Sequence, residues 1–407
     1  MKKVRLILIL AAICCFSGCV DDSYRGTFDV PDEMEDILPI PIWMTIGETT
    51  DIFSDPLSRG SGLISGAEDF SDKCFYVYAF NQDFFTSMKT TYADDPMWCL
   101  VDGSVDDPES LAGRAAHWNS TYERVSWETG DELYWPIVNG RGQRYDFFAY
   151  YIDDLELTNE HFHRDDDKVM IDIEIDGSQD IMSSKAATPI EELLEKFPEQ
   201  EDRENIQRYC YSYYTALKDV HPQFLFKHHL VKLDFRLEPG ITLGKTKQVT
   251  VNKVEIRSRY KASFIVADSN DPSRVGLYFE DEYTRLPLAE ADGSPFKGGY
   301  TVETLPVSGV IPEPETMGGS LLVAPGTQYS LYLSLSEVHD GRPLEPHELE
   351  VELYQGAKSD PTPFMAGNEY KVTLTVYGMM DVRVGTNVGI WESGGNTNID
   401  TEQKPFE

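Results

Sequence analysis

The sequence predicts an all-β protein of two β-sandwich domains in series, with a short helical insert between them. Its 407 residues are enough for two domains at roughly 150 residues each. Apolar and polar side chains alternate with period two in several short segments, as in residues 169–175, 231–237 and 370–376. Glycines and prolines separate these segments, which is typical of β-sandwiches.

The first predicted sandwich occupies residues 61–178. It begins with the apolar strand 75–80, and two further segments flank the turn-forming Thr129-Gly130-Asp131. A heavily aromatic strand follows at residues 145–151. Residues 169–175 alternate cleanly and complete the domain.

The predicted helical insert occupies residues 179–223. Thr188-Pro189-Ile190-Glu191 supplies an N-cap, a proline at the first helical position and a capping-box glutamate. A second helical pattern extends from Ile206 to Leu217, because its apolar side chains recur every three or four residues.

The second predicted sandwich occupies residues 224–407. Its first strand, residues 231–237, has one apolar face and one polar face. The apolar positions of residues 249–256 change phase in the middle, so we expect a β-bulge near Asn252-Lys253.

The N-terminus has the pattern of an exported lipoprotein. Positive charges at Lys2, Lys3 and Arg5 precede an apolar run of about a dozen residues, which is too short to span a bilayer. The motif Phe16-Ser17-Gly18-Cys19 then resembles the bacterial lipobox. The resemblance implies cleavage between Gly18 and Cys19 and a lipid, with acyl chains such as palmitate, on the Cys19 thiol. We therefore predict a lipoprotein signal peptide over residues 1–18. The alternative is an ordinary secretory signal whose cysteines are incidental.

Residues 19–60 are predicted to form a lipidated acidic tether or propeptide. Asp21 and Asp22 follow the lipid site, and Pro31, Pro39 and Pro41 interrupt the segment. Acidic, proline-punctuated sequence of this kind is more often extended than packed.

Charge and cysteine content exclude several classes of function. The formal net charge of −35 becomes −38 without residues 1–18, which carry three positive charges and no negative ones. Such a surface repels nucleic acid and anionic membrane. Cys74, Cys99 and Cys210 have no C-x-x-C spacing, which excludes a structural zinc site. A Cys74–Cys99 disulfide and three buried thiols are the open alternatives.

The sequence predicts no enzyme, no cofactor and no metal site. Catalytic motifs such as G-x-S-x-G, H-E-x-x-H and G-x-x-x-x-G-K-[ST] are absent. The ligand-rich stretch 161–167 is read as a solvated loop, and Asp172-x-Glu174-x-Asp176-Gly177 as a strand that ends in a turn. His228 and His229 point to opposite faces of a strand, so both cannot serve one metal from there.

Aromatic side chains offer a second class of binding site, because exposed rings stack on sugars. The candidates are Trp98, Trp118, Trp127 and Trp135. At alternating strand positions such rings are more often part of the core, which we favour here.

Several segments together resemble the fimbrillin-type pilins of Bacteroidales, the subunits of type V pili. They are the lipobox, Trp127-x-x-Gly130-Asp131-x-x-x-Trp135-Pro136 with the aromatic strand after it, Gln179-Asp180-Ile181-Met182, Phe226-x-His228-His229-x-Val231-x-Leu233, Phe364-x-x-Gly367-x-x-Tyr370 and Ile390-Trp391-x-x-Gly394. In this order they extend over residues 19–395. The resemblance implies two transthyretin-like β-sandwiches.

The resemblance also implies a mechanism of assembly. Subunits of this family are exported as lipoproteins and cut by a trypsin-like protease after an arginine that precedes the first strands. Loss of the N-terminal strand leaves an apolar groove and an unpaired sheet edge, which a strand of the neighbouring subunit fills. The position that matches is Arg59, with the cut before Gly60, and Arg25 is the second candidate. The alternative is an uncut loop at Arg59.

A donated strand also has candidates near the C-terminus. They are Val382, Val384, Val388 and Ile390. These side chains either enter a neighbouring subunit or close their own sandwich.

The first hypothesis is therefore a structural or adhesive fimbrial subunit. It would be lipid-anchored to the outer membrane and surface-exposed, would enter the fimbrium after maturation, and would have other fimbrial subunits as partners. The alternative is a non-polymerising surface lipoprotein that anchors fimbriae or binds host or bacterial glycans, and a hydrolase ranks third. A strand at residues 60–72 favours a shaft subunit, whereas a C-terminal run paired within its own domain weakens it.

Overall fold

Strands dominate the computed structural model, and most of them pair antiparallel. The structure describes residues 28–29, 39–47, 67–83, 87–103, 111–128, 132–138, 141–153, 157–186, 196–243, 245–339 and 341–390. The all-β prediction is confirmed. No helix in this described part is long and apolar enough to cross a bilayer.

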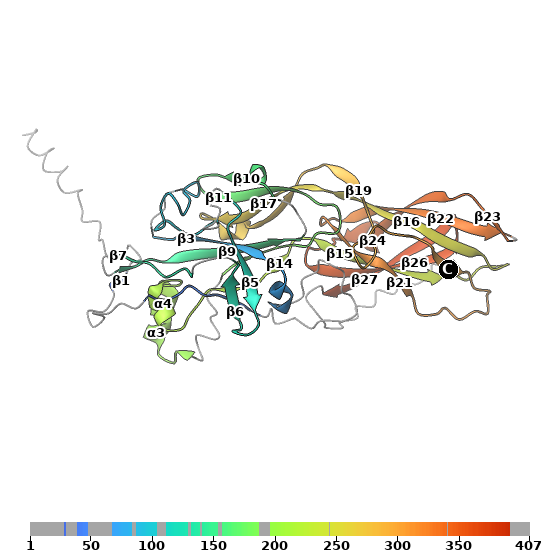
Figure 1. Cartoon of the computed structure of the whole chain (residues 1–407). Coiled ribbons are helices and arrows are strands. Elements are labelled where there is room, and N and C mark those ends of the chain that lie inside the picture. The colour runs from blue at the N-terminus through green and yellow to red at the C-terminus, as the bar shows by residue number, and fades with distance from the viewer. Residues whose placement is uncertain are drawn as a thin grey trace, which may run out of the picture.

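Two sheets face each other in the N-terminal half (Figure 1). The larger has the order β14-β12-β9-β3-β5-β6, and β4 pairs with β3. Its strands are β3 (Phe75–Asn81), β4 (Cys99–Val101), β5 (Arg114–Asn119), β6 (Arg124–Trp127), β9 (Tyr145–Ile152), β12 (Ile181–Lys185) and β14 (Lys227–His228). The smaller has the order β10-β11-β17-β18, with strands β10 (Phe162–Arg164), β11 (Lys168–Glu174), β17 (Lys261–Asp268) and β18 (Gly276–Phe279).

The C-terminal half is a second sandwich. Its smaller sheet has the order β21-β15-β26-β27, with strands β15 (Val231–Pro239), β21 (Glu315–Val323), β26 (Asn368–Gly378) and β27 (Asp381–Ile390). Its larger sheet has the order β19-β16-β22-β24-β25, with strands β16 (Gln248–Arg259), β19 (Tyr283–Pro287), β22 (Gln328–His339), β24 (His347–Ala357) and β25 (Asp360–Thr362). β20 (Tyr300–Glu303) pairs with β16, and β23 (Arg342–Pro343) with β22. The register shift between Val251 and Lys253 confirms the expected β-bulge.

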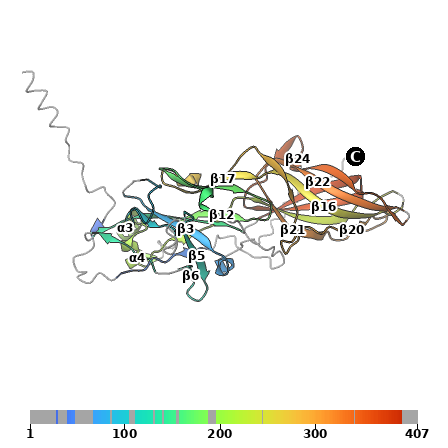
Figure 2. The same ribbon diagram turned by 45° about the horizontal axis from the view of Figure 1, so that its top comes forward.

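The two sandwiches lie end to end, and both views agree on this (Figures 1 and 2). A long strand joins them, because β16 of the C-terminal sandwich continues through Tyr260 into β17, which pairs with β11. The domain boundaries expected from the sequence stay a prediction, but the strand pairing does not follow the boundary at residue 224. Residues 261–268 were expected in the second sandwich, but they form a strand of the first one.

Helices cover the outer face of the larger N-terminal sheet. α3 (Gln200–Arg208) buries Ile206, and α4 (Tyr213–Leu217) buries Tyr213 and Ala216. These side chains belong to a second apolar core outside the sandwich, together with Phe75, Phe147 and other side chains of β3 and β9. The predicted helix that starts at Thr188 lies outside the described residues.

The smaller elements lie around this core and at the loops. They are β1 (Phe28–Asp29), β2 (Thr45–Ile46), β7 (Ile137–Val138), β8 (Arg141–Gly142), β13 (Gln223–Phe224) and the 3-10 turns η2 (Ala67–Ser71), η3 (Asn159–His161) and η4 (Pro272–Arg274). β1 pairs with β8, and β2 pairs parallel with β13.

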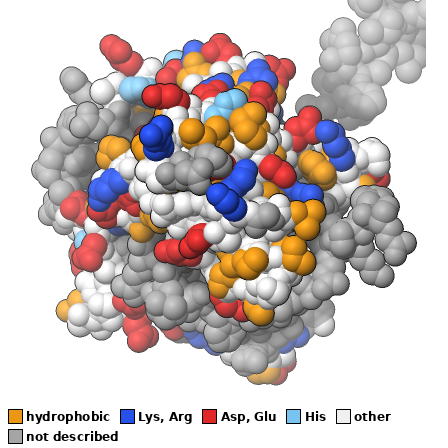
Figure 3. Space-filling model, turned by 90° about the vertical axis from the view of Figure 1, so that its right-hand side faces the viewer, with side chains coloured by type: hydrophobic (Ala, Val, Ile, Leu, Met, Phe, Trp, Pro, Cys, Tyr) orange, Lys and Arg blue, Asp and Glu red, His pale blue; other side chains and the backbone are white. Residues whose placement is uncertain are grey.

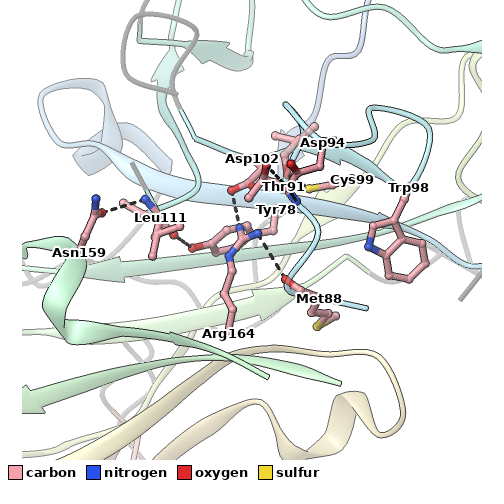
Figure 4. Close-up of polar contacts among 12 residues, drawn as sticks. Tyr78, Met88, Thr91, Asp94, Trp98, Cys99, Asp102, Leu111, Asn159 and Arg164 are labelled. Atoms are coloured by element: carbon pink, nitrogen blue, oxygen red, sulfur yellow. Dashed lines mark hydrogen bonds and ion pairs between the residues drawn. The ribbon is translucent and has the colours of Figure 1, made fainter. Parts of the chain in front are cut away.

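A buried ion pair ties the residue that follows β4 to β10, and the same arginine holds the loop before β4 (Figure 4). The guanidinium of Arg164 donates to Asp102 Oδ1 over 2.5 Å and to the main-chain oxygen of Met88 over 3.3 Å. The two charged side chains are only 6% and 4% exposed. The face of the Tyr78 ring lies 5.4 Å below the guanidinium. The predicted solvated loop at residues 161–167 is therefore wrong in part, since β10 lies inside it and Arg164 points inward.

Candidate functional site

An N-terminal segment, residues 39–47, completes the N-terminal sandwich from outside the sheets named above. The amide of Ile42 donates to the Leu133 oxygen (2.6 Å), and the Trp135 amide donates to the Ile40 oxygen (3.0 Å). The Val125 amide of β6 donates to the Met44 oxygen over 2.8 Å. These contacts pair one side of the segment with β6 and with residues 133–135.

The other side of the segment pairs with β13. The Thr45 amide donates to the Pro222 oxygen and the Gly47 amide to the Phe224 oxygen, both over 2.9 Å. The segment is thus a strand held between two chain stretches that are distant in sequence. We call its surroundings the strand site, defined as residues 124–127, 133–135 and 221–224.

Alternate side chains of the segment enter the second apolar core. Met44 is 0% and Ile42 3% exposed, and the half-buried Ile40 and Ile46 pack against the same core. Burial of one such side chain contributes about 1.5–3 kcal/mol. Residues 39–47 are therefore packed rather than free, unlike the expectation for residues 19–60, whose role as a tether or propeptide stays a prediction.

The chain that follows the segment has an anchor of its own. η2 buries Phe70, whose ring lies 5.0 Å from that of Phe226 and 5.2 Å from that of Phe75. Residues 67 onward would stay in place if the segment before them left. A strand at residues 60–72 would favour a shaft subunit, and residues 67–71 of that stretch form this 3-10 turn.

Trp43 faces away from the core and contacts both borders of the strand site. Its ring centroid lies 3.7 Å from that of His221, next to β13. The guanidinium carbon of Arg124, in β6, lies 5.7 Å from the same ring. The segment therefore brings an aromatic ring between a histidine and an arginine.

Burial lowers the pKa of His221 to about 4. Asp219 Oδ1, 3.3 Å from Nε2, opposes this shift, whereas the positive charges of Lys196 and Arg124 add to it. Hydrogen bonding to Lys196 in turn lowers the pKa of Asp219, so its carboxylate stays ionised at mildly acidic pH. His221 is therefore neutral while Trp43 covers it.

We predict that the segment is held less tightly as the pH falls from about 6.5 towards 4. Removal of the segment uncovers His221 and raises its pKa towards the ordinary value near 6.5, so the uncovered ring takes up a proton more readily than the covered ring. Docking is thus strongest above pH 6.5 and loses up to about 1.4 kcal/mol per pH unit below it. Protection factors of the Val125 and Trp135 amides at pH 7.5 and pH 5 measure this, and His221→Gln should flatten the difference. Equal pH dependence in the variant would contradict it.

Most of the site residues predicted from the sequence lie outside the described part of the chain. These are Gly18, Cys19, Arg25, Arg59 and Gly60. Their roles in lipidation and maturation stay predictions.

The predicted donor residues lie on β27, which pairs with β26 over most of its length. Val382 is buried, Val384 is half-buried and Val388 is 39% exposed. β27 is the edge strand of its sheet and closes its own sandwich. This pairing of β27 within its own domain weakens the shaft-subunit hypothesis.

The other candidate residues are buried or contact neighbouring side chains of the fold. Trp98, Trp118 and Trp135 are buried, which confirms the core prediction for them, and Trp127 is half-buried beneath the Arg114 guanidinium. His228 lies 2.9 Å from Asp180 and His229 lies 2.7 Å from Ser183. These contacts account for both histidines within the fold.

The cysteines do not form the disulfide that the sequence left open. Cys74 Sγ donates to Glu128 Oε2 over 2.8 Å, and Cys99 is a buried thiol near the Val101 oxygen. Among the described residues, no group of three or more His, Cys, Asp or Glu side chains is arranged to hold a metal ion.

The far end of the C-terminal sandwich is a second surface of interest (Figure 3). Leu243, Val307 and Val310 of the C-terminal half are exposed, in loops that the Thr242–Leu305 main-chain hydrogen bond holds side by side. Charged side chains lie between the apolar ones on this face.

Comparisons with known proteins return structures but no sequence families. No family model matches the chain, and no curated protein matches it. A fimbrial protein from Bacteroides vulgatus is 14% identical, with 86% of this chain and 99% of that chain covered and a TM-score of 0.46. A proposed cell adhesion protein from Bacteroides uniformis is 16% identical, with coverages of 87% and 98% and a TM-score of 0.41.

The tip fimbrial protein Mfa3 from Porphyromonas gingivalis, with a C-terminal truncation, is also similar. It is 9% identical, with 86% of this chain and 99% of that chain covered and a TM-score of 0.38. The structural neighbours of this chain are fimbrial and proposed cell-adhesion proteins of Bacteroidales.

The sequence contains a period-two pattern that predicts a strand at residues 39–47, but the proline and acid content around it favours a linker. Ile40, Ile42, Met44 and Ile46 alternate with period two, as in a half-buried strand. Pro39 precedes them and Pro41 lies between Ile40 and Ile42, and both prolines favour a linker, but proline is compatible with an edge strand. The partners of the segment, which lie about 80 and 180 residues further along the chain, leave no mark in its own sequence.

Proposed function

We propose that this chain is a subunit of a cell-surface fimbria, exported as a lipoprotein and completed by a strand from another subunit. The observation that supports this proposal is the packing of the 39–47 segment. It lies before Arg59, forms main-chain hydrogen bonds along both sides, and buries Ile42 and Met44. A cut at Arg59 would convert a covalently tethered strand into an exchangeable one.

The consequence of such a cut follows from the bonds that would be lost. The amides of Val125 and Trp135 and the oxygens of Leu133, Pro222 and Phe224 would lose their partners. Unpaired main-chain groups beside an apolar surface favour the addition of another strand. Phe70 and the sheets behind it would hold the remaining chain.

In this proposal the chain accepts a strand at its N-terminal end. Val382, Val384, Val388 and Ile390 stay donor candidates only if β27 first leaves β26. A tip, accessory or anchoring subunit does not need β27 to leave β26. These roles therefore agree better with the closed C-terminal sandwich than a shaft role does.

We predict a single early cleavage when residues 20–407 are treated with a trypsin-like protease. Amino-terminal sequencing should find Gly60 as the new first residue, since Arg59 separates the 39–47 segment from η2. An Arg59→Ala variant should resist this cut, and an Arg25→Ala variant should be cut like the parent. Loss of the Gly60 product from Arg25→Ala alone, or no cut at either arginine, would contradict the proposed maturation.

We predict that Cys19 carries the lipid that holds the unprocessed chain at the outer membrane. Each buried CH₂ of an acyl chain contributes about 0.8 kcal/mol, so several chains hold firmly. A Cys19→Ala variant should therefore move from the detergent phase to the aqueous phase in detergent partitioning. The double variant Cys14→Ala/Cys15→Ala should still partition with detergent. A detergent-phase Cys19→Ala protein would contradict the assignment.

A further inference from the structure

The shape of the strand site limits which side chains a strand bound there can have. Residues two apart on a strand share a face, so positions 40, 42, 44 and 46 all point towards the second core. Positions 42 and 44 are closed to solvent, and positions 40 and 46 are half-buried. The site therefore requires large aliphatic side chains at four alternating positions.

The outer face adds a second requirement, between the two inner positions. There Trp43 lies against His221 on one border and Arg124 on the other. An arginine over an aromatic ring contributes about 0.5–1 kcal/mol at exposed sites, and the covered imidazole loses its stacking partner without the ring. An aromatic side chain at this position is therefore preferred.

The edge strand β27 of a second copy does not meet these requirements. Its one apolar face carries Val382, Val384, Thr386, Val388 and Ile390, and its other face carries Arg383, Gly385, Asn387 and Gly389. Every placement that fills the four positions from the apolar face, in either direction, puts Thr386 at position 42 or 44. The same placements put Gly385 or Asn387 where Trp43 lies. A buried hydroxyl without a partner costs about 1–3 kcal/mol.

We propose that the strand site selects a strand from a different subunit rather than β27 of a second copy. The partner strand carries four alternating large aliphatic side chains and an aromatic side chain between the inner two. His221 and Arg124 are the residues that contact this aromatic side chain and favour it over an aliphatic one. This selectivity rests on the proposed function, because it presupposes that the site accepts strands after cleavage.

Competition between peptides on the cleaved 20–407 chain tests the selectivity. A fluorescent peptide of residues 39–47 is bound first and then displaced by unlabelled competitors. The Trp43→Phe peptide should compete within about threefold of the parent, and the Trp43→Leu peptide about tenfold more weakly, which corresponds to about 1.4 kcal/mol. A peptide of residues 381–390 should not displace the probe at concentrations where the parent peptide displaces all of it.

Protein variants locate the preference in the site. In Arg124→Ala and His221→Ala proteins, the difference between the parent and Trp43→Leu peptides should shrink towards zero. Equal competition by the 381–390 peptide, or an unchanged preference in both variants, would overturn the selectivity. If the fluorescent peptide fails to bind the cleaved chain at all, the proposed strand exchange itself is wrong. The two failures are therefore distinguishable.

Discussion

Replacing Met44 with aspartate is expected to detach the 39–47 segment while both sandwiches stay folded. Met44 has no exposed surface, and its place in the core would receive an ionised carboxylate. Burial of an unpaired charge costs several kcal/mol, more than the roughly 1 kcal/mol that a main-chain hydrogen bond contributes. Loss of the methionine removes about 1.5–3 kcal/mol of apolar burial as well. The segment is therefore more stable in solvent than in its site.

Hydrogen exchange at two amides reports this detachment directly. The amides of Val125 and Trp135 donate to oxygens of the segment, so they should lose protection in Met44→Asp. Amides of β9, which pair with β3 and β12, should keep theirs. Thr45→Asp is the matched control, because it adds the same charge on the outer face of the segment. Continued protection of Val125 and Trp135 in Met44→Asp would mean that the core does not hold this strand.

The second large effect is expected for Asp102→Asn. The substitution leaves the Arg164 charge buried without its counter-ion, since both side chains are more than nine-tenths buried. Removal of one partner of a buried ion pair typically costs about 3–5 kcal/mol. We expect the denaturation midpoint of the N-terminal sandwich to fall accordingly, followed by tryptophan fluorescence because Trp98 lies in the tethered loop.

Asp165→Asn is the control for this prediction. Asp165 adjoins Arg164 in sequence and pairs with Lys168 over 3.7 Å, but its carboxylate is exposed and Lys168 is only half-buried. Such pairs contribute about 0–1 kcal/mol, so the midpoint should barely move. Equal effects of the two substitutions would show that the buried pair does not stabilise the loop.

Period-two patterns predicted the local structure well, because they depend only on which face of a strand is buried. The aromatic strand at 145–151 became β9, the alternation at 169–175 became β11, and the phase change near Lys253 became a bulge. Such a pattern does not say which strand pairs with which. The placement of β17 beside β11 therefore could not be predicted, and neither could the exit of β17 from the predicted second domain.

The strand site was missed for a related reason. Its segment is short, contains two prolines and follows an acidic stretch, and composition averaged over such a window favours a linker. The buried Arg164 was missed because charged side chains in sequence usually indicate solvent exposure, whereas pairing with Asp102 permits burial. In both cases the deciding partner lies far away in the chain.

Uptake of a fluorescent 39–47 peptide by the cleaved and uncleaved 20–407 chains measures strand exchange at the strand site. We expect the chain cut after Arg59 to exchange its own segment for the peptide. The uncut chain should exclude the peptide, because its tethered segment competes at high effective concentration. Failure of both forms to take up the peptide would contradict strand exchange at this site. Equal uptake by both would contradict the role of cleavage.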